Sequence, residues 1–322
     1  MDGKRLVWLD SCKGFLILLV IFGHSTHGGL FHINNALASV AMPGFMACSG
    51  WLAHQVGGAK ILRRFRQLII PFVLWSLISL VIKGDSISQI GTIFLNPDAY
   101  YIWFLWALFW IFCIFNICLW VANKTKINEV ICILSIMILL MSIMVILNLR
   151  LFGFQFIAYY FIFYSLGYFY RNYRGIQIHN NVLLAVVFCV WAFLAYYWQM
   201  HELPYWMPTN TPIPSSVLQY SYRGTTSAIG VILVLALFSK FMNADNCINR
   251  ALVNIGGISL GLYVVHVIIN EKVYNLIMYI FPSINIYALI AIEFSVVFLI
   301  SYAIVKVLSK FKYTNQYLLG KL

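Results

Sequence analysis

The segment "WLDSCKGFLILLVIFGHSTH", residues 8–27, combines an apolar run with polar side chains at both of its ends. The ten residues between Lys13 and His24 are all apolar or glycine, as in the middle of a membrane helix. Asp10 stands before the run and His27 after it. Charged and imidazole side chains are costly in hydrocarbon, so they are expected to face a protein interior or an aqueous cavity. The segment therefore predicts a first membrane helix with one polar face.

The composition extends this prediction to the whole chain. Of the 322 residues, 62% are hydrophobic and only 9% are charged, whereas an average soluble domain is about 25% charged. We therefore predict an all-α polytopic integral membrane protein with about ten transmembrane helices. We also expect residues 1–322 to form a single transmembrane domain with no appended soluble domain. The apolar runs lie near 12–31, 36–54, 68–83, 100–122, 129–148, 152–171, 181–200, 222–241, 255–271 and 285–307.

The net charge of +12 follows the loops of this predicted topology. If the N-terminus is cytoplasmic, all Lys and Arg except Lys83, Arg150, Arg223 and Lys272 fall in cytoplasmic segments. This is the positive-inside pattern of membrane proteins, and it predicts an even number of spans with both termini in the cytoplasm. The positive charge is thereby explained without nucleic acid as a partner.

Lys13 and His24 are eleven residues apart in the first predicted helix. At 100° and 1.5 Å per residue, they differ by about 20° in direction and about 16 Å in height. Asp10 and His27 fall within about 60° of the same face. Such a face suits a functional cavity, although a structural histidine bonded to a neighbouring helix is the alternative.

A second group of polar residues lies in "AKILRRFRQLIIPF", residues 59–72. Arg63 and Arg66 share one face of a helix directly before an apolar run. The planar guanidinium group is well suited to binding phosphate. The alternatives are a topology signal or a contact with lipid headgroups.

A third group lies in "NIGGISLGLYVVHVIIN", residues 254–270, where His266 stands inside an apolar run. Three polar residues share its helical face: Ser259, Tyr263 and Asn270. A hydrogen-bonded core histidine is the alternative interpretation. Glu293 in the last run is a further intramembrane ionisable group, which costs about 2.5–3.5 kcal/mol on insertion scales unless it is paired or neutral.

Several common catalytic patterns are missing from the sequence. It contains no HExxH motif, no P-loop and no GxGxxG. We therefore expect no metal site. If the protein is an enzyme, its general base is expected to be a histidine and its phosphate recognition to use Arg and Lys.

The motifs together resemble the membrane acyltransferase family 3. That family opens with Arg, Leu-Asp and a basic residue followed by Gly, then places a His after ten intervening residues. The corresponding residues here are Arg5, Leu9, Asp10, Lys13, Gly14 and His24. Lys13 departs from the more common Arg, which keeps the charge but loses the bidentate fork.

Later segments continue the resemblance in the same order. "MPGFMACSGWLA" is similar to the second-helix pattern that ends in Ser-Gly, and Arg63-x-x-Arg66 followed by Pro71 is similar to the family's Arg-x-x-Arg motif. "YYIWFLWALFW" resembles a segment of the fucose 4-O-acetylase-like branch of sugar O-acetyltransferases. "FIFYSLGYFY" and "ISLGLYVVH", which ends at His266, fit the later pattern.

The resemblance implies an O-acetyltransferase of the cell inner (plasma) membrane. Such an enzyme moves an acyl group, usually acetyl, from cytosolic acetyl-CoA to a hydroxyl of an envelope polysaccharide or lipid-linked sugar, such as O-antigen, capsule or exopolysaccharide. Acetyl-CoA would be a co-substrate, with no permanently bound cofactor, and membrane lipid would surround the protein.

Residue roles follow from the resemblance and the polar faces together. His24 would be the general base, since an imidazole with a pKa near 6.5 suits that work at neutral pH. Asp10 would either orient Lys13 or hold the entry of the helix. Lys13, Arg63 and Arg66 would bind the coenzyme A phosphates. The weaker expectations are His266 as an alternative base and Tyr263, Glu293 and Arg223 as acceptor contacts.

Two other functions remain compatible with the sequence. A transporter or flippase of a lipid-linked envelope sugar would also place polar groups among about ten helices, although no half-chain repeat is visible. A non-enzymatic partner in polysaccharide assembly would depend on no single histidine. In each case the aromatic connector at residues 205–223 could contact either a sugar or the membrane interface.

Overall fold

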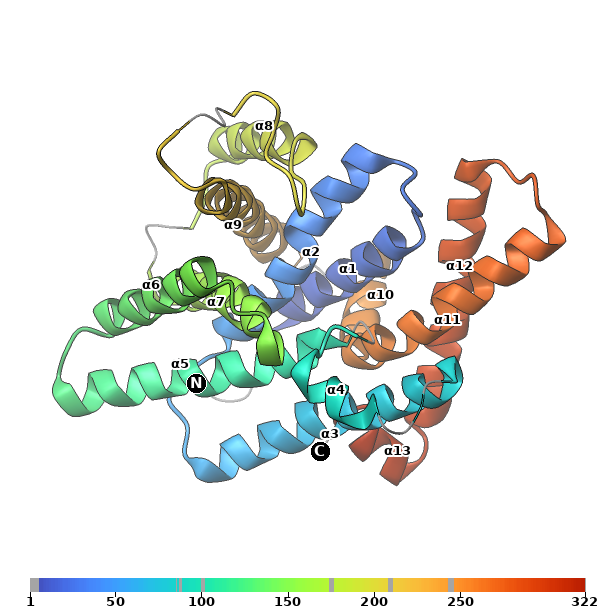
Figure 1. Ribbon diagram of the computed structural model, residues 1–322, viewed down its shortest axis with the longest axis horizontal. Coiled ribbons are helices and arrows are strands. Elements are labelled where there is room, and N and C mark those ends of the chain that lie inside the picture. The colour runs from blue at the N-terminus through green and yellow to red at the C-terminus, as the bar shows by residue number, and fades with distance from the viewer. Residues whose placement is uncertain are drawn as a thin grey trace. The chain divides into compact units, whose positions relative to one another are not determined.

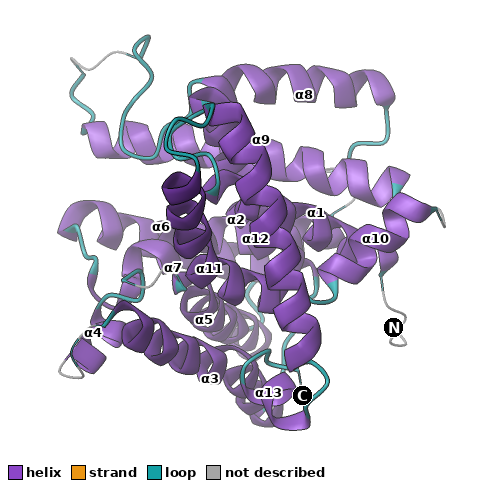
Figure 2. Cartoon of the chain, turned by 90° about the vertical axis from the view of Figure 1, so that its right-hand side faces the viewer, coloured by secondary structure: helices purple, strands orange, loops and turns teal. Residues whose placement is uncertain are grey.

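The computed structural model describes residues 6–84, 86, 89–99, 102–173, 177–207, 211–242 and 246–321. Every regular element within these ranges is a helix (Figures 1 and 2), which confirms the all-α polytopic class. Each predicted apolar run overlaps one long helix, although the ends differ. These helices are α1 (Val7–His24), α2 (Phe31–Trp51), α3 (Gly58–Lys83), α5 (Trp103–Thr125), α6 (Glu129–Leu147), α7 (Phe154–Asn172), α8 (Asn181–Tyr196), α9 (Ser215–Phe241), α11 (Ser259–Ile280) and α12 (Ile286–Leu308).

Short helical elements lie between the long helices or after the last of them, and they were not predicted. They are α4 (Ile90–Leu95), the 3-10 turn η2 (Leu151–Gly153), α10 (Cys247–Gly256) and α13 (Lys312–Tyr317). Within the described ranges, seven helices are individually long and apolar enough to cross a membrane, or eight if the bent pair α10 and α11 forms one span. Neither α2 nor the 16-residue α8 belongs to that set. The count of ten spans and the cytoplasmic termini therefore remain predictions.

Helix α1 ends seven residues earlier than the predicted boundary at residue 31. At its C-terminus the Ser25 hydroxyl donates to the Ile21 carbonyl at 3.1 Å, and the Thr26 hydroxyl donates to the Gly23 carbonyl at 2.8 Å. Side-chain donors of this kind satisfy carbonyl groups that a helix end leaves unpaired. The helix also begins earlier than predicted, at Val7.

The turn after α1 has an unusual backbone. His27, Gly28 and Leu30 adopt φ values of 44°, 81° and 55°, in the left-handed region. Only glycine adopts that region without a steric cost. The expectation that His27 extends the polar helical face is therefore wrong, because His27 lies in the turn and not on the helix.

The chain divides into two compact units, which are described separately. The first comprises residues Met1–Trp51, Leu166–Ser259 and Asn270–Phe298. Here α1 packs against α2, α9 and α10, and α9 packs against α2 and α8. A Cβ atom at Gly14 would overlap the Leu252 carbonyl, and one at Gly256 would overlap the Asp10 carbonyl. The backbones of α1 and α10 therefore touch, which only residues without a side chain permit.

The second unit comprises Leu52–Ser165, Leu260–Ile269 and Leu299–Leu322. Its interior contains an aromatic cluster in which Phe72, Phe94 and Trp106 lie 5.4–6.4 Å apart between ring centroids. The Asn116 side chain makes two hydrogen bonds, of 2.8 and 3.2 Å, to the backbone of Val56. It thereby fixes the connector between α2 and α3 against α5.

Candidate active site

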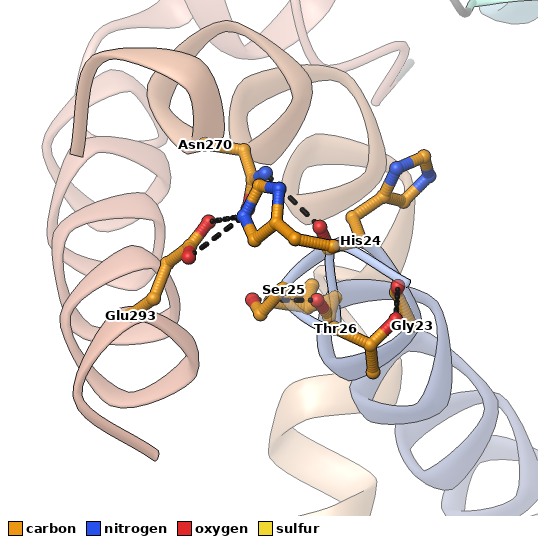
Figure 3. Close-up of polar contacts among 8 residues, drawn as sticks. Gly23, His24, Ser25, Thr26, Asn270 and Glu293 are labelled. Carbon is orange, nitrogen blue, oxygen red and sulfur yellow. Dashed lines mark hydrogen bonds and ion pairs between the residues drawn. The ribbon is translucent and has the colours of Figure 1, made fainter. Parts of the chain in front are cut away.

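The turn after α1 contains a histidine–carboxylate contact (Figure 3). The Nε2 atom of His27 lies 2.8 Å from both carboxylate oxygens of Glu293 on α12. The Glu293 side chain is completely buried, whereas that of His27 is 28% exposed. The His27 ring also packs on Tyr274 of α11, with centroids 4.0 Å apart. The intramembrane carboxylate that the sequence left without a partner is thus paired with His27.

His24 occupies the last position of α1, and its backbone and side chain have different surroundings. Its carbonyl oxygen accepts a hydrogen bond of 3.3 Å from the Asn270 side chain. In Figure 3 the His24 imidazole points away from Glu293. His24 is exposed, although Ser25 and Thr26 beside it are fully buried. The backbone at His24 is therefore fixed by α11 while its imidazole is accessible.

Asp10 and Lys13 face each other near the other end of α1. The Lys13 Nζ atom lies 3.8 Å from the Asp10 carboxylate, and the two side chains are 23% and 16% exposed. Both Lys13 and His24 lie within α1, so the separation of about 16 Å along the helix applies to them. One rigid helix thus presents an ion pair near its beginning and an accessible imidazole at its end.

Arg223 lies in the first unit on α9 and is 9% exposed. Its guanidinium carbon lies 5.3 Å from the Trp198 ring centroid and 5.6 Å from that of Tyr220. The connector between α8 and α9 also presents Tyr205 and Trp206, which are 84% and 43% exposed. A buried cation with accessible aromatic rings nearby can bind the rings and hydroxyls of a sugar.

The remaining predicted residues lie in the second unit. His266 is fully buried, and its Nδ1 atom lies 2.9 Å from the Leu262 carbonyl, so Nδ1 carries the proton. Tyr263 is also buried, and its hydroxyl accepts a hydrogen bond of 3.4 Å from the Phe104 backbone at the start of α5. The contacts of Tyr263 are those of a residue that fixes a helix terminus.

Arg63 and Arg66 lie near the beginning of α3, as expected, and both are exposed. Lys60 and Arg64 in the same turns are exposed as well. Exposed basic groups on a helix end can contact the phosphates of a polyphosphate. Arg5 of the opening motif lies outside the described residues.

Sequence reasoning gave too little weight to His27 and Asn270. Asn270 was placed on the His266 face, but its contact with the His24 carbonyl was not predicted. The signal for His27 was the cost of burying Glu293, which requires a partner of opposite charge or a hydrogen-bond donor. Among the described residues, no group of three or more His, Cys, Asp or Glu side chains is arranged to hold a metal ion.

Fold and polar sites together define a multi-pass helical membrane protein with a histidine-containing turn. A family model described as an acyltransferase domain matches residues 6–309. The chain belongs to this family, the acyltransferase family 3, and is a membrane acyltransferase. No curated protein and no solved structure matches the chain.

Proposed function

We propose that the protein transfers an acetyl group from acetyl-CoA to a hydroxyl of an envelope glycan. The observation that carries this proposal is the arrangement on α1, where Lys13 and the accessible imidazole of His24 lie about 16 Å apart on one helix. Separate positions of this kind suit a donor that is held by its phosphates and an acceptor that is activated elsewhere. The family match supports acyl transfer as the reaction class.

His24 is the general base of the proposed reaction. Its neutral imidazole takes the proton of the acceptor hydroxyl as the oxygen attacks the thioester carbonyl. The carbon–sulfur bond then breaks, and the departing coenzyme A sulfur receives that proton from the imidazolium. The products are the O-acetyl ester and free coenzyme A, so atoms and charge balance.

The other polar residues bind one of the two substrates or hold the turn beside the base. In the second unit, Arg63 and Arg66 bind phosphate groups of coenzyme A. In the first unit, Lys13 is held by Asp10 and provides a positive charge for phosphate binding. His27 and Glu293 fix the turn that follows the base. Arg223 and the aromatic connector contact the acceptor, which an acidic sugar would suit best. His266 is the alternative base because its Nε2 atom is the unprotonated nitrogen of the neutral ring.

The test compares envelope glycans from cells with and without the gene by mass spectrometry. We expect the mass increment of an acetyl group on a sugar only when the gene is present, and its loss in cells that carry His24→Ala. Purified protein in vesicles should also transfer labelled acetyl from acetyl-CoA to that glycan. Translocation of a lipid-linked sugar without any acetylation would favour the transporter alternative.

A further inference from the structure

The segment that follows α13, residues 318–321, lies against the arginine-bearing helix α3. The Trp75 indole Nε1 donates a hydrogen bond of 2.8 Å to the Leu318 carbonyl. Gly320 is buried with φ 63°, and a Cβ atom there would overlap the Gln67 carbonyl. Figures 1 and 2 both show α13 beside α3. The 318–321 segment therefore contacts the backbone of α3 directly after Arg66.

The same segment contacts α11 within the second unit. Leu319 is 2% exposed, and its Cδ2 atom lies 3.0 Å from the position of a Cβ atom at Gly261. Hydrogen bonds from Leu319 N to Thr314 O at 3.1 Å and from Lys321 N to Asn315 O at 3.0 Å hold the segment in shape. It is thus a preformed turn between α3 and the part of α11 that carries Tyr263 and His266.

The beginning of α3 needs such support. Its N-cap residue, Gly57, provides no side-chain hydrogen bond, and the first buried residue of the helix is Leu68. Before Leu68 the exposed turns bring together four like charges: Lys60, Arg63, Arg64 and Arg66. Like charges three or four residues apart destabilise a helix, and an uncapped end tends to fray. The contact between Gly320 and the Gln67 backbone lies directly after these turns, where it can oppose both the charge repulsion and the fraying.

We propose that the 318–321 segment positions the basic turns of α3 and thereby sets the affinity for a phosphate-bearing acyl donor. The proposal rests on the proposed function only for the identity of that donor. The residues 318–321 are positioning residues, since they act through Arg63 and Arg66. The segment lies beyond residues 6–309, which the family model matches.

The test uses Gly320→Ala and Trp75→Phe in the purified full-length protein. The loss of one hydrogen bond or a close backbone contact is expected to raise KM for acetyl-CoA about three- to tenfold, with kcat at saturation nearly unchanged. Acetyl-pantetheine, a thioester without the nucleotide phosphates, should be used as well by both variants as by the wild type. An equal loss with both donors, or an unchanged KM for acetyl-CoA, would overturn the proposal.

Matched controls separate this effect from general damage. Gly84→Ala introduces the same left-handed strain, at φ 74°, at the other end of α3, where a Cβ atom meets nothing within 4 Å among the described residues. Trp106→Phe removes an equivalent indole hydrogen bond, of 2.8 Å to the Phe152 carbonyl, away from the 318–321 segment. Neither control should change the ratio of KM values for acetyl-CoA and acetyl-pantetheine.

Backbone hydrogen exchange tests the positioning step without any donor. Gly320→Ala should accelerate exchange of the amides of residues 60–66 relative to Gly84→Ala. If exchange is not accelerated, the proposal is wrong whatever the donor proves to be. If exchange is accelerated while the wild type does not use acetyl-CoA, the positioning role stands and the proposed function fails.

Discussion

His24 and His27 are three residues apart but have different surroundings. The His24 imidazole is accessible and points away from Glu293, whereas the His27 imidazole is bound to that carboxylate. An accessible neutral ring can approach a substrate hydroxyl, and a ring already held by a buried carboxylate is suited to fixing the turn. The two histidines are close in the sequence, but the surroundings of their rings differ.

We predict that His24→Ala lowers glycan acetylation about 10²–10⁴-fold, the usual contribution of general-base catalysis. Expression and acetyl-CoA binding should stay normal. The wild-type rate should rise with pH through the imidazole range, because only the neutral ring accepts a proton. Acetylation assays in matched membranes check both points. If His24→Ala retains activity while His266→Ala abolishes it, the base lies on α11.

We predict that His27→Ala acts mainly on stability. It removes the His27 contact of the fully buried Glu293 carboxylate, and breaking a buried pair costs at most about 3–5 kcal/mol. The cost is smaller here because the His27 side chain is 28% exposed. Thermal unfolding in detergent should show a lower Tm for His27→Ala and partial recovery in His27→Ala/Glu293→Gln, whose amide carries no charge. A His27→Ala protein with normal Tm but no activity would contradict this prediction.

The polar site was only partly predictable from these residues. Helical periodicity placed Lys13 and His24 on one face, and both do lie on α1. Periodicity could not place His27, because α1 ends at His24 and His27 adopts a left-handed backbone in the turn that follows. Nor could it pair His27 with Glu293, which is 266 residues away in the chain.

Helix α3 combines an exposed basic beginning with an apolar remainder. Arg63 and Arg66 occupy its exposed turns, and burial begins at Leu68. This division within one helix matches a role at a membrane surface, where phosphate groups of either lipid or coenzyme A are accessible. If the arginines bind lipid phosphates, added acidic lipid competes for them; if they bind coenzyme A, added coenzyme A does.

We predict that Arg63→Ala and Arg66→Ala each weaken acetyl-CoA binding about tenfold, as expected for the loss of a charge-assisted hydrogen bond. Lys83→Ala at the other end of α3 is the matched control and should bind normally. Equilibrium binding of labelled acetyl-CoA in detergent provides the measurement. Normal binding by both arginine variants would reduce the pair to a topology signal.

The elements were more predictable than their ends. Each apolar run became a helix because hydrocarbon requires every backbone group to be hydrogen-bonded within its own segment. The run at 255–271 was drawn too short, since α11 continues to Ile280 and α10 precedes it. Short helix α10 escaped prediction because its Asn246 cap and its packing against α1 stabilise it, and neither gives an apolar run.

The path of the whole chain through the membrane depends on whether α2 and α8 span it. Neither helix is among those long and apolar enough to do so by themselves. With ten spans, five helices separate Gly57 from Glu202, whereas without α8 only four do. The contact of the 318–321 segment with α3 places that segment beside the basic turns, as expected if both lie on the cytoplasmic side.

We predict that reporters fused after Gly57 and after Glu202 lie on opposite sides of the membrane. A reporter after Lys321 should lie on the side of Gly57, because the preceding residues pack against α3. Paired alkaline phosphatase and fluorescent protein fusions measure the two sides. The same side for Gly57 and Glu202 would show that α8 does not span.

The crossing of α1 and α10 has a consequence for mutational surveys of this protein. Because the two backbones touch at Gly14 and Gly256, any side chain there must force the helices apart. Lipid supplies no hydrophobic drive to press them together again. A survey scored by activity alone would therefore rank Gly14 and its neighbour Lys13 as equally intolerant, although one position is constrained by space and the other by charge. Only a parallel measurement of protein abundance distinguishes a lost helix contact from a lost ligand contact.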